Sequence, residues 1–175
     1  MKGTILKCIQ ELVSENHGPE IWAKVLDNSS YPTYMPILAT ADIPDEDIYS
    51  VLGCLQTELG VDAEYVFAAF AEYWMTTYAP RVYARLIHNV SSSREFLLGL
   101  DALHVRVAGA VVGAKPPRYK YEWEGPDTLI MHYYSERGLI DLMCAMARAL
   151  GKSFGDDIEF VKKIDDVRLR IKFKR

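Results

Sequence analysis

The fold is decided by residues 113–135, GAKPPRYKYEWEGPDTLIMHYYS. Before Pro116 and Pro117 the apolar residues recur at helical spacing, and after this pair they alternate every second residue, as in strands. Segments 118–123 and 127–135 are predicted to form a hairpin. Because proline ends a helix and stiffens the following turn, the pair also predicts a seam between two subdomains.

The same patterns, followed outward, predict the remaining elements. Asp62 and one of Ser92 and Ser93 are expected to cap helices at the N-terminus, and Gly60 is expected to end one. Segment 28–44 is expected to be a long connection. The predicted helices cover residues 2–17, 19–27, 45–59, 62–78, 94–112 and 138–153, with a further short helix before residue 91 and two last strands over 157–164 and 166–174.

Helices followed by strands, with one helix inserted, indicate an α+β fold with an antiparallel sheet of about four strands. The chain of 175 residues suits one domain over residues 1–175. Within it we expect a helical subdomain over 1–60, with further helices and the sheet over 61–175. A chain of this length buries roughly 70% of its unfolded surface.

The composition excludes several classes of protein. There are 20 Lys and Arg residues against 24 Asp and Glu, a net charge of -4 without a basic run, which disfavours a nucleic acid or an anionic membrane as the main partner. No apolar run approaches the ~20 residues of a membrane helix, and the N-terminus lacks a signal-peptide core. The widely spaced Cys8, Cys54 and Cys144 exclude a disulfide framework or structural zinc site. We expect a soluble, cytoplasmic protein.

His104 interrupts the apolar stripe of the helix 94–112. Such a histidine is commonly a hydrogen-bonded core residue, and a metal ligand is the other possibility. A neutral imidazole in an apolar pocket is the usual proximal ligand of haem iron, and burial favours the neutral form. No function is assigned to His17, His88 or His132.

A second cluster comprises Tyr133, Ser135 and Arg137. Alternate residues of an extended segment point to one side, so the cluster would project two hydroxyls and a guanidinium together. These groups could bind a ligand with two carboxylates, such as the haem propionates. An edge strand whose polar side faces solvent is the alternative, and the pattern alone favours it.

Taken together, these residues resemble the haem–nitric oxide/oxygen binding (H-NOX) family, to which the haem domain of soluble guanylate cyclase belongs. The resemblance covers the whole chain. It is carried by the MKGTI start, by LDALHVRV around His104, by GAKPPR and by YYSERG, which contains the family's Y-x-S-x-R motif as Tyr133, Ser135 and Arg137.

The resemblance implies a haem b cofactor buried between the two subdomains. His104 would be the axial iron ligand, and Tyr133, Ser135 and Arg137 would bind the propionates. Ile5 and Pro117 match positions that press on the porphyrin and distort it. The predicted distal pocket is lined by Trp74, Tyr78, Leu142 and Met146, all of which could instead be core residues.

Leu142 matches the position of a distal Tyr in relatives that bind oxygen stably. Leucine donates no hydrogen bond to bound O₂, whereas NO and CO need such a donor much less. We therefore expect ferrous haem that binds NO and CO and discriminates against O₂. The indole N–H of Trp74 could serve as the donor instead. An O₂ or redox haem sensor therefore stays open as an alternative function.

The expected mechanism is a switch without catalysis, since no catalytic motif is evident. The resemblance implies that NO weakens the bond from His104 to iron, so that the haem relaxes off Pro117 and Ile5 and the N-terminal helices shift. The expected partner is a bacterial histidine kinase, a cyclic-di-GMP enzyme or a chemotaxis receptor, either separate or on a longer chain. A haem-free interaction module is the remaining alternative.

Overall fold

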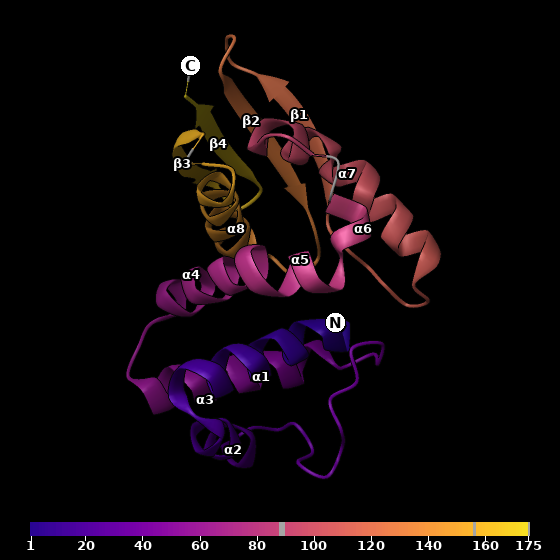
Figure 1. The fold of residues 1–175 in the computed structure, drawn as a ribbon, viewed down its shortest axis with the longest axis vertical. Coiled ribbons are helices and arrows are strands. Elements are labelled where there is room, and N and C mark those ends of the chain that lie inside the picture. Colours follow the sequence, from indigo (N-terminus) through magenta and orange to yellow (C-terminus); the bar gives the residue numbers. More distant parts are fainter. Residues whose placement is uncertain (88–89, 156, 175) are drawn as a thin grey trace. The chain divides into compact units, whose positions relative to one another are not determined.

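The computed structural model describes every residue except 88–89, 156 and 175, and of Leu86 and Ile87 only the backbone; His88 lies outside the described residues. The chain divides into two compact units, Met1–Tyr73 and Trp74–Arg175. Figure 1 shows helices alone in the first unit, and helices with a sheet in the second. The predicted helical N-terminal part and four-stranded antiparallel sheet are confirmed.

The N-terminal unit consists of four helices, α1 (Gly3–His17), α2 (Pro19–Asn28), α3 (Asp45–Leu59) and α4 (Ala63–Tyr73). Their apolar faces form its core, because residues spaced three and four apart share one side of a helix. Seven of the buried residues in this core are Leu6, Ile9, Val13, Ile48, Val51, Leu55 and Phe70.

The connection between α2 and α3 caps the first turn of α1. The backbone N–H of Gly3 donates to Ala41 O at 2.8 Å, and that of Thr4 donates to Ala39 O at 2.9 Å. These bonds satisfy donors that a helix start leaves without intrahelical partners. The long connection predicted from sequence therefore holds the helix that bears Ile5.

The predicted end of one helix and start of the next, between α3 and α4, are confirmed. Gly60 ends α3 in the left-handed conformation, with a φ of 66°. The Asp62 carboxylate accepts the N–H of Tyr65 at 2.8 Å and so caps α4. Since the units divide after Tyr73, α4 lies in the first unit, whereas the boundary expected at residue 60 precedes it.

The C-terminal unit contains the sheet. Its helical elements are η1 (Trp74–Tyr78), α5 (Ala79–Val82), α6 (Ala84–Ile87), α7 (Ser93–Ala110) and α8 (Ile140–Ser153). Its strands are β1 (Arg118–Trp123), β2 (Thr128–Tyr134), β3 (Ile158–Asp165) and β4 (Arg168–Phe173), in the order β1-β2-β4-β3 and all antiparallel.

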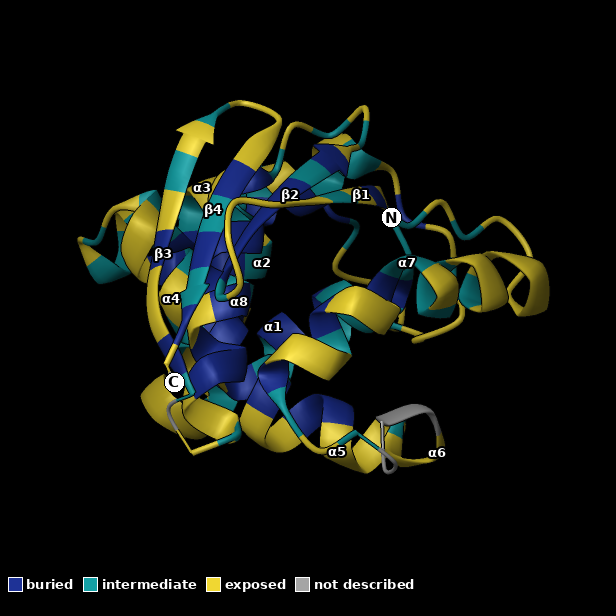
Figure 2. Cartoon of the chain, turned by 90° about the horizontal axis from the view of Figure 1, so that it is seen from above, coloured by how far each residue is buried: buried dark blue, intermediate teal, exposed yellow. Residues whose placement is uncertain are grey.

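Both long helices of this unit cover one face of the sheet. α7 packs on β1, and α8 packs on β3 and β4 (Figure 1). The covered face carries apolar and aromatic residues, because side chains on a strand alternate between the two faces. Figure 2 shows α8 largely buried, whereas the C-terminal turns of α7 are exposed.

One predicted helix is not continuous. The pattern over 62–78 predicts a single α-helix, but α4 ends at Tyr73 and η1 is π-helical. Pro80 has no N–H to donate to the carbonyl of Thr76, so one α-helical hydrogen bond is missing at the end of η1. The rings of Trp74 and Tyr78 stack across the wider turn, with centroids 5.3 Å apart.

No helix in the described part of the chain is long and apolar enough to span a membrane.

Candidate functional site

The imidazole of His104 is fixed by the turn before β1. Nδ1 lies 2.8 Å from the carbonyl oxygen of Pro117. A carbonyl only accepts, so Nδ1 must carry the proton of the neutral ring, which leaves the lone pair on Nε2. Nε2 has no hydrogen-bond partner among the described residues. This is the arrangement of a metal-ligating histidine whose second nitrogen is held by a backbone carbonyl.

The surroundings of His104 favour the neutral ring. Burial lowers the pKa of His104 below its ordinary value, and this effect outweighs the hydrogen bond to Pro117 and the charge of Asp101, which raise it. A neutral imidazole is the form that binds a metal. His104 is half-buried near the middle of α7.

Asp101, three residues before His104, ties α7 to β1. Its carboxylate accepts two hydrogen bonds from Arg118, at 2.8 and 2.9 Å, and one from the N–H of Tyr119 at 2.8 Å. These bonds, with the charge of Arg118, lower the pKa of Asp101 to about 2. In addition, the N–H of Asp101 donates to the Tyr121 hydroxyl at 3.2 Å. The clamp fixes the start of β1 against α7 and so places Pro117 O beside His104.

Tyr119 occupies the space between His104 and the Tyr133 of the second cluster. Its buried ring lies 5.4 Å from the His104 ring and 6.0 Å from the Tyr133 ring, measured between centroids. Tyr119 and Tyr133 are paired across β1 and β2, so both face α7 and α8. Sequence reasoning missed Tyr119 and Asp101, since only the docking of α7 on β1 brings them to His104.

The spacing of the second cluster predicts an extended segment, but the structure shows a turn. β2 ends at Tyr134, and the chain then turns through Glu136 and Arg137. The Arg137 N–H donates to the Ser135 hydroxyl oxygen at 3.3 Å, which forms a local turn that the i, i+2 spacing does not reveal. The Arg137 guanidinium donates to Lys115 O at 2.7 Å. The cluster is thereby tied to the Pro116-Pro117 turn.

The cluster has the donors that a carboxylate requires. The hydroxyls of Tyr133 and Ser135 donate to no acceptor in the described chain, although Tyr133 is buried. Arg137, whose backbone N–H donates to the Ser135 hydroxyl, adds a positive charge to the cluster. Hydroxyl donors and a guanidinium on one side, with a neutral imidazole on the other side of Tyr119, fit the propionates and iron of a haem.

The predicted distal residues lie on two elements that pack together, η1 and α8. Trp74 is half-buried and Tyr78 is buried on η1, whereas Leu142 and Met146 are half-buried on successive turns of α8. Ile5 lies on α1 in the other unit and is half-buried. Its predicted contact with a porphyrin, like that of Pro117, stays a prediction.

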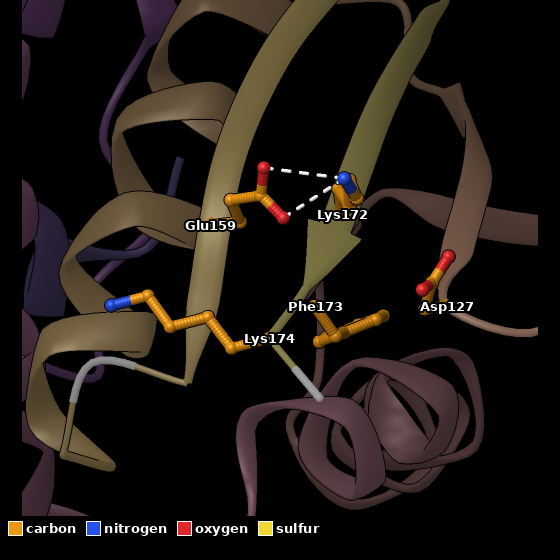
Figure 3. Close-up of a pocket in the computed structure, with 5 residues that line it drawn as sticks. All are labelled: Asp127, Glu159, Lys172, Phe173 and Lys174. Carbon is orange, nitrogen blue, oxygen red and sulfur yellow. Dashed lines mark hydrogen bonds and ion pairs between the residues drawn. The ribbon is translucent and has the colours of Figure 1, made fainter.

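A pocket near β3 and β4 is separate from the predicted haem site. It lies where β3 and β4 meet the start of β2, and Glu159 and Lys172 point toward one another in it, with oxygen-to-nitrogen distances of 3.0 and 3.2 Å (Figure 3). The ion pair satisfies both charges. None of its described lining residues, Asp127, Glu159, Lys172, Phe173 and Lys174, belongs to the predicted haem site.

A family model described as haem-NO-binding matches residues 2–162. The chain belongs to the haem-NO-binding, or H-NOX, family. H-NOX domains bind haem and are sensors of gases such as NO and O₂. The family predicted from the residues around His104 and Tyr133 is thereby confirmed.

Among the relatives of this H-NOX chain are two soluble guanylate cyclases of Caenorhabditis elegans. The cyclase gcy-32 is 28% identical over 167 residues, which cover 92% of this chain and 24% of the cyclase. The cyclase gcy-35 is 23% identical over 170 residues, which cover 95% of this chain and 25% of the cyclase. The chain thus spans about a quarter of the length of these relatives.

Solved H-NOX structures share the fold. An Fe(II)NO H-NOX protein from S. oneidensis has a TM-score of 0.89 at 16% identity, with 100% of both chains covered. An unliganded Fe(II) H-NOX protein from K. algicida has a TM-score of 0.86 at 20% identity, with 100% and 97% covered. An oxygen-binding H-NOX domain has a TM-score of 0.81 at 20% identity, with 100% and 96% covered.

Proposed function

We propose that this H-NOX domain holds haem b through His104, Tyr133, Ser135 and Arg137, binds NO and CO in preference to O₂, and passes a structural change to an effector. The observation that carries the proposal is the contact of His104 Nδ1 with Pro117 O, which leaves Nε2 as the metal-binding atom. When bound, the haem would supply a ferrous iron able to take up a diatomic gas.

The residues of the chain have separate roles in this proposal. His104 would attach α7 to the iron, while Tyr133, Ser135 and Arg137 would orient the porphyrin through its carboxylates. Ile5 and Pro117 would each press on the porphyrin. The gas-binding pocket would be lined by four residues of η1 and α8, two elements that pack together: Trp74, Tyr78, Leu142 and Met146.

Selectivity follows from the side chain at position 142. Leu142 offers no hydrogen-bond donor, and bound O₂ acquires negative charge that a donor stabilises by ~0.5–1.5 kcal/mol or more in an apolar pocket. NO and CO depend much less on such a donor. We therefore expect discrimination against O₂.

The signal would leave through α7. Its Asp101 contacts with Arg118 and Tyr119 do not depend on a gas, whereas an attachment of His104 to iron does. Loss of that attachment would release α7 from the iron alone, and the contacts of Asp101 and His104 with residues 117–119 would still hold it. Such a two-state element can bias an effector in the cytoplasm, for which a histidine kinase, a cyclic-di-GMP enzyme, a chemotaxis receptor or further segments of the same chain are the candidates.

An anaerobic titration of the reduced protein with NO, CO and O₂ tests the proposal. We expect Soret absorption from bound haem, shifts with NO and CO, and no stable complex in air. A protein that takes up no haem would contradict the cofactor assignment and support a haem-free interaction module. A stable oxygen complex would contradict the selectivity alone.

One observation favours a second candidate, an O₂ or redox sensor. Trp74 lies on η1, the element that packs against α8, and its indole carries an N–H donor. If the protein binds O₂ stably, Trp74→Phe should abolish that binding. Unchanged oxygen binding in this variant would exclude Trp74 as the donor.

A further inference from the structure

Tyr119 connects the candidate iron ligand to helix α8. Its ring centroid lies 5.4 Å from that of His104, with an angle of 41° between the planes. Aromatic rings at this separation attract one another beyond the area they bury. The ring therefore limits rotation of the imidazole about its own bond.

The hydroxyl of Tyr119 reaches the other long helix. It donates a hydrogen bond to Met143 Sδ at 3.3 Å, and both residues are buried. Met143 lies between Leu142 and Met146 in the chain. Leu142 and Met146 are the two residues of α8 predicted to line the distal pocket. The side chain of Tyr119 thus contacts His104 through its ring and helix α8 through its hydroxyl.

The backbone of Tyr119 is fixed as well. Its N–H donates to Asp101 Oδ1 at 2.8 Å, and Asp101 lies on α7, one turn before His104. This bond holds the backbone of Tyr119 beside α7, at the level of the imidazole. These three contacts, together with the Tyr133 ring at 6.0 Å, hold Tyr119 in place.

We propose that Tyr119 is a positioning residue whose ring sets the orientation of the His104 imidazole and whose hydroxyl couples that orientation to α8. The proposal rests on the proposed role of His104 as the iron ligand. A change at His104 then moves the ring of Tyr119, and Met143 follows through the O–H···S bond. The coupling links α7 to α8 within the C-terminal unit.

Three substitutions distinguish the effect of the Tyr119 ring from that of its hydroxyl. Tyr119→Phe removes the hydroxyl alone, Met143→Leu removes the sulfur at similar volume, and Tyr119→Leu removes the ring. Tyr134→Phe is the matched control, since Tyr134 lies on β2 and is 47% exposed. All proteins are studied as purified, reduced and saturated with CO.

Two measurements test the two halves of the proposal. The ¹⁵N chemical shifts of the His104 imidazole report its tautomer and orientation, and Tyr119→Leu should shift or broaden them. Hydrogen exchange of the amides of residues 142–146 reports the coupling. Tyr119→Phe and Met143→Leu should each accelerate it about threefold to tenfold, the effect of losing one buried hydrogen bond.

The double variant Tyr119→Phe/Met143→Leu gives the decisive comparison. If the bond carries the coupling, the double variant exchanges no faster than either single variant. Additive acceleration, or imidazole shifts that Tyr119→Leu leaves unchanged, would overturn the proposal. Should Tyr119→Leu not fold, the exchange cycle still decides it. Absence of bound haem would contradict the proposed function, while both measurements remain interpretable for Tyr119.

Discussion

The carbonyl oxygen of Pro117 lies 2.8 Å from Nδ1 of His104, a residue 13 positions earlier in the chain. This contact joins the turn before β1 to the helix that carries the imidazole. It fixes which ring nitrogen keeps its proton, and it orients the other nitrogen for a metal.

We expect His104→Gly to lose its haem on gel filtration and to regain it when imidazole is added. The free imidazole occupies the space of the missing side chain and supplies the ligand atom. His17→Gly, at an exposed position at the end of α1, should retain haem as the natural chain does. Haem binding by His104→Gly without imidazole would remove His104 as the ligand.

Arg137→Ala should weaken haem retention by about 10- to 100-fold, because a charged hydrogen bond to a carboxylate is lost. Haem transfer to an apo-globin acceptor measures this loss. Arg137 also donates to Lys115 O, so its loss affects the chain before β1 as well as a propionate. The experiment is therefore repeated with the dimethyl ester of haem, which has no carboxylate charge. If Arg137 binds a propionate, the natural chain and the variant should retain the ester equally; a persistent difference would assign Arg137 a role in the turn alone.

Leu142→Tyr should raise the oxygen affinity of the reduced protein by about tenfold or more, since a phenol donates the hydrogen bond that leucine lacks. Leu142→Phe controls for ring volume and should bind oxygen as weakly as the natural chain. Optical titration of the reduced proteins with oxygen checks both. Equal behaviour of the Tyr and Phe variants would mean that position 142 does not face the bound gas.

Asp101→Asn should lower the free energy of unfolding by about 1 kcal/mol at neutral pH, because solvent around the exposed Arg118 screens the ion pair. The pKa of Asp101 is about 2 in the folded chain, below the ordinary 3.8. The carboxylate therefore stabilises the fold above pH 3.8 and loses this effect as pH falls toward 2. Urea unfolding across this range should show the two proteins converge, whereas Asp27→Asn, at an exposed position on α2, should match the natural chain.

Gly3→Ala should destabilise the N-terminal unit by about 2 kcal/mol or more, as backbone must move to admit the methyl group. A Cβ at position 3 would overlap with Leu38 O. Gly53→Ala, on α3 with nothing within 4 Å of the added Cβ, should instead stabilise the protein by about 0.5–1 kcal/mol. Thermal unfolding compares them, and equal melting temperatures would contradict the close approach.

Local signals predicted most of the fold. Residues 45–59 and 118–123 were placed with the bounds that α3 and β1 have, because caps, glycine and alternation act over a few residues. Ser92 is the helix cap that the serine run suggested, since its hydroxyl accepts from Glu95 N at 3.2 Å. The π-helical η1 was missed, as its widening depends on Trp74 stacking and Pro80.

The sequence by itself determined the α+β class, the family and the residue types of the candidate site, His104 and the Tyr133 motif among them, because these depend on spacing along the chain. Only the tertiary structure decided which nitrogen of His104 meets Pro117, that Tyr119 lies against it and that Asp101 clamps Arg118. Those contacts join residues far apart in the chain, and their geometry is set by the packing of α7 on the sheet.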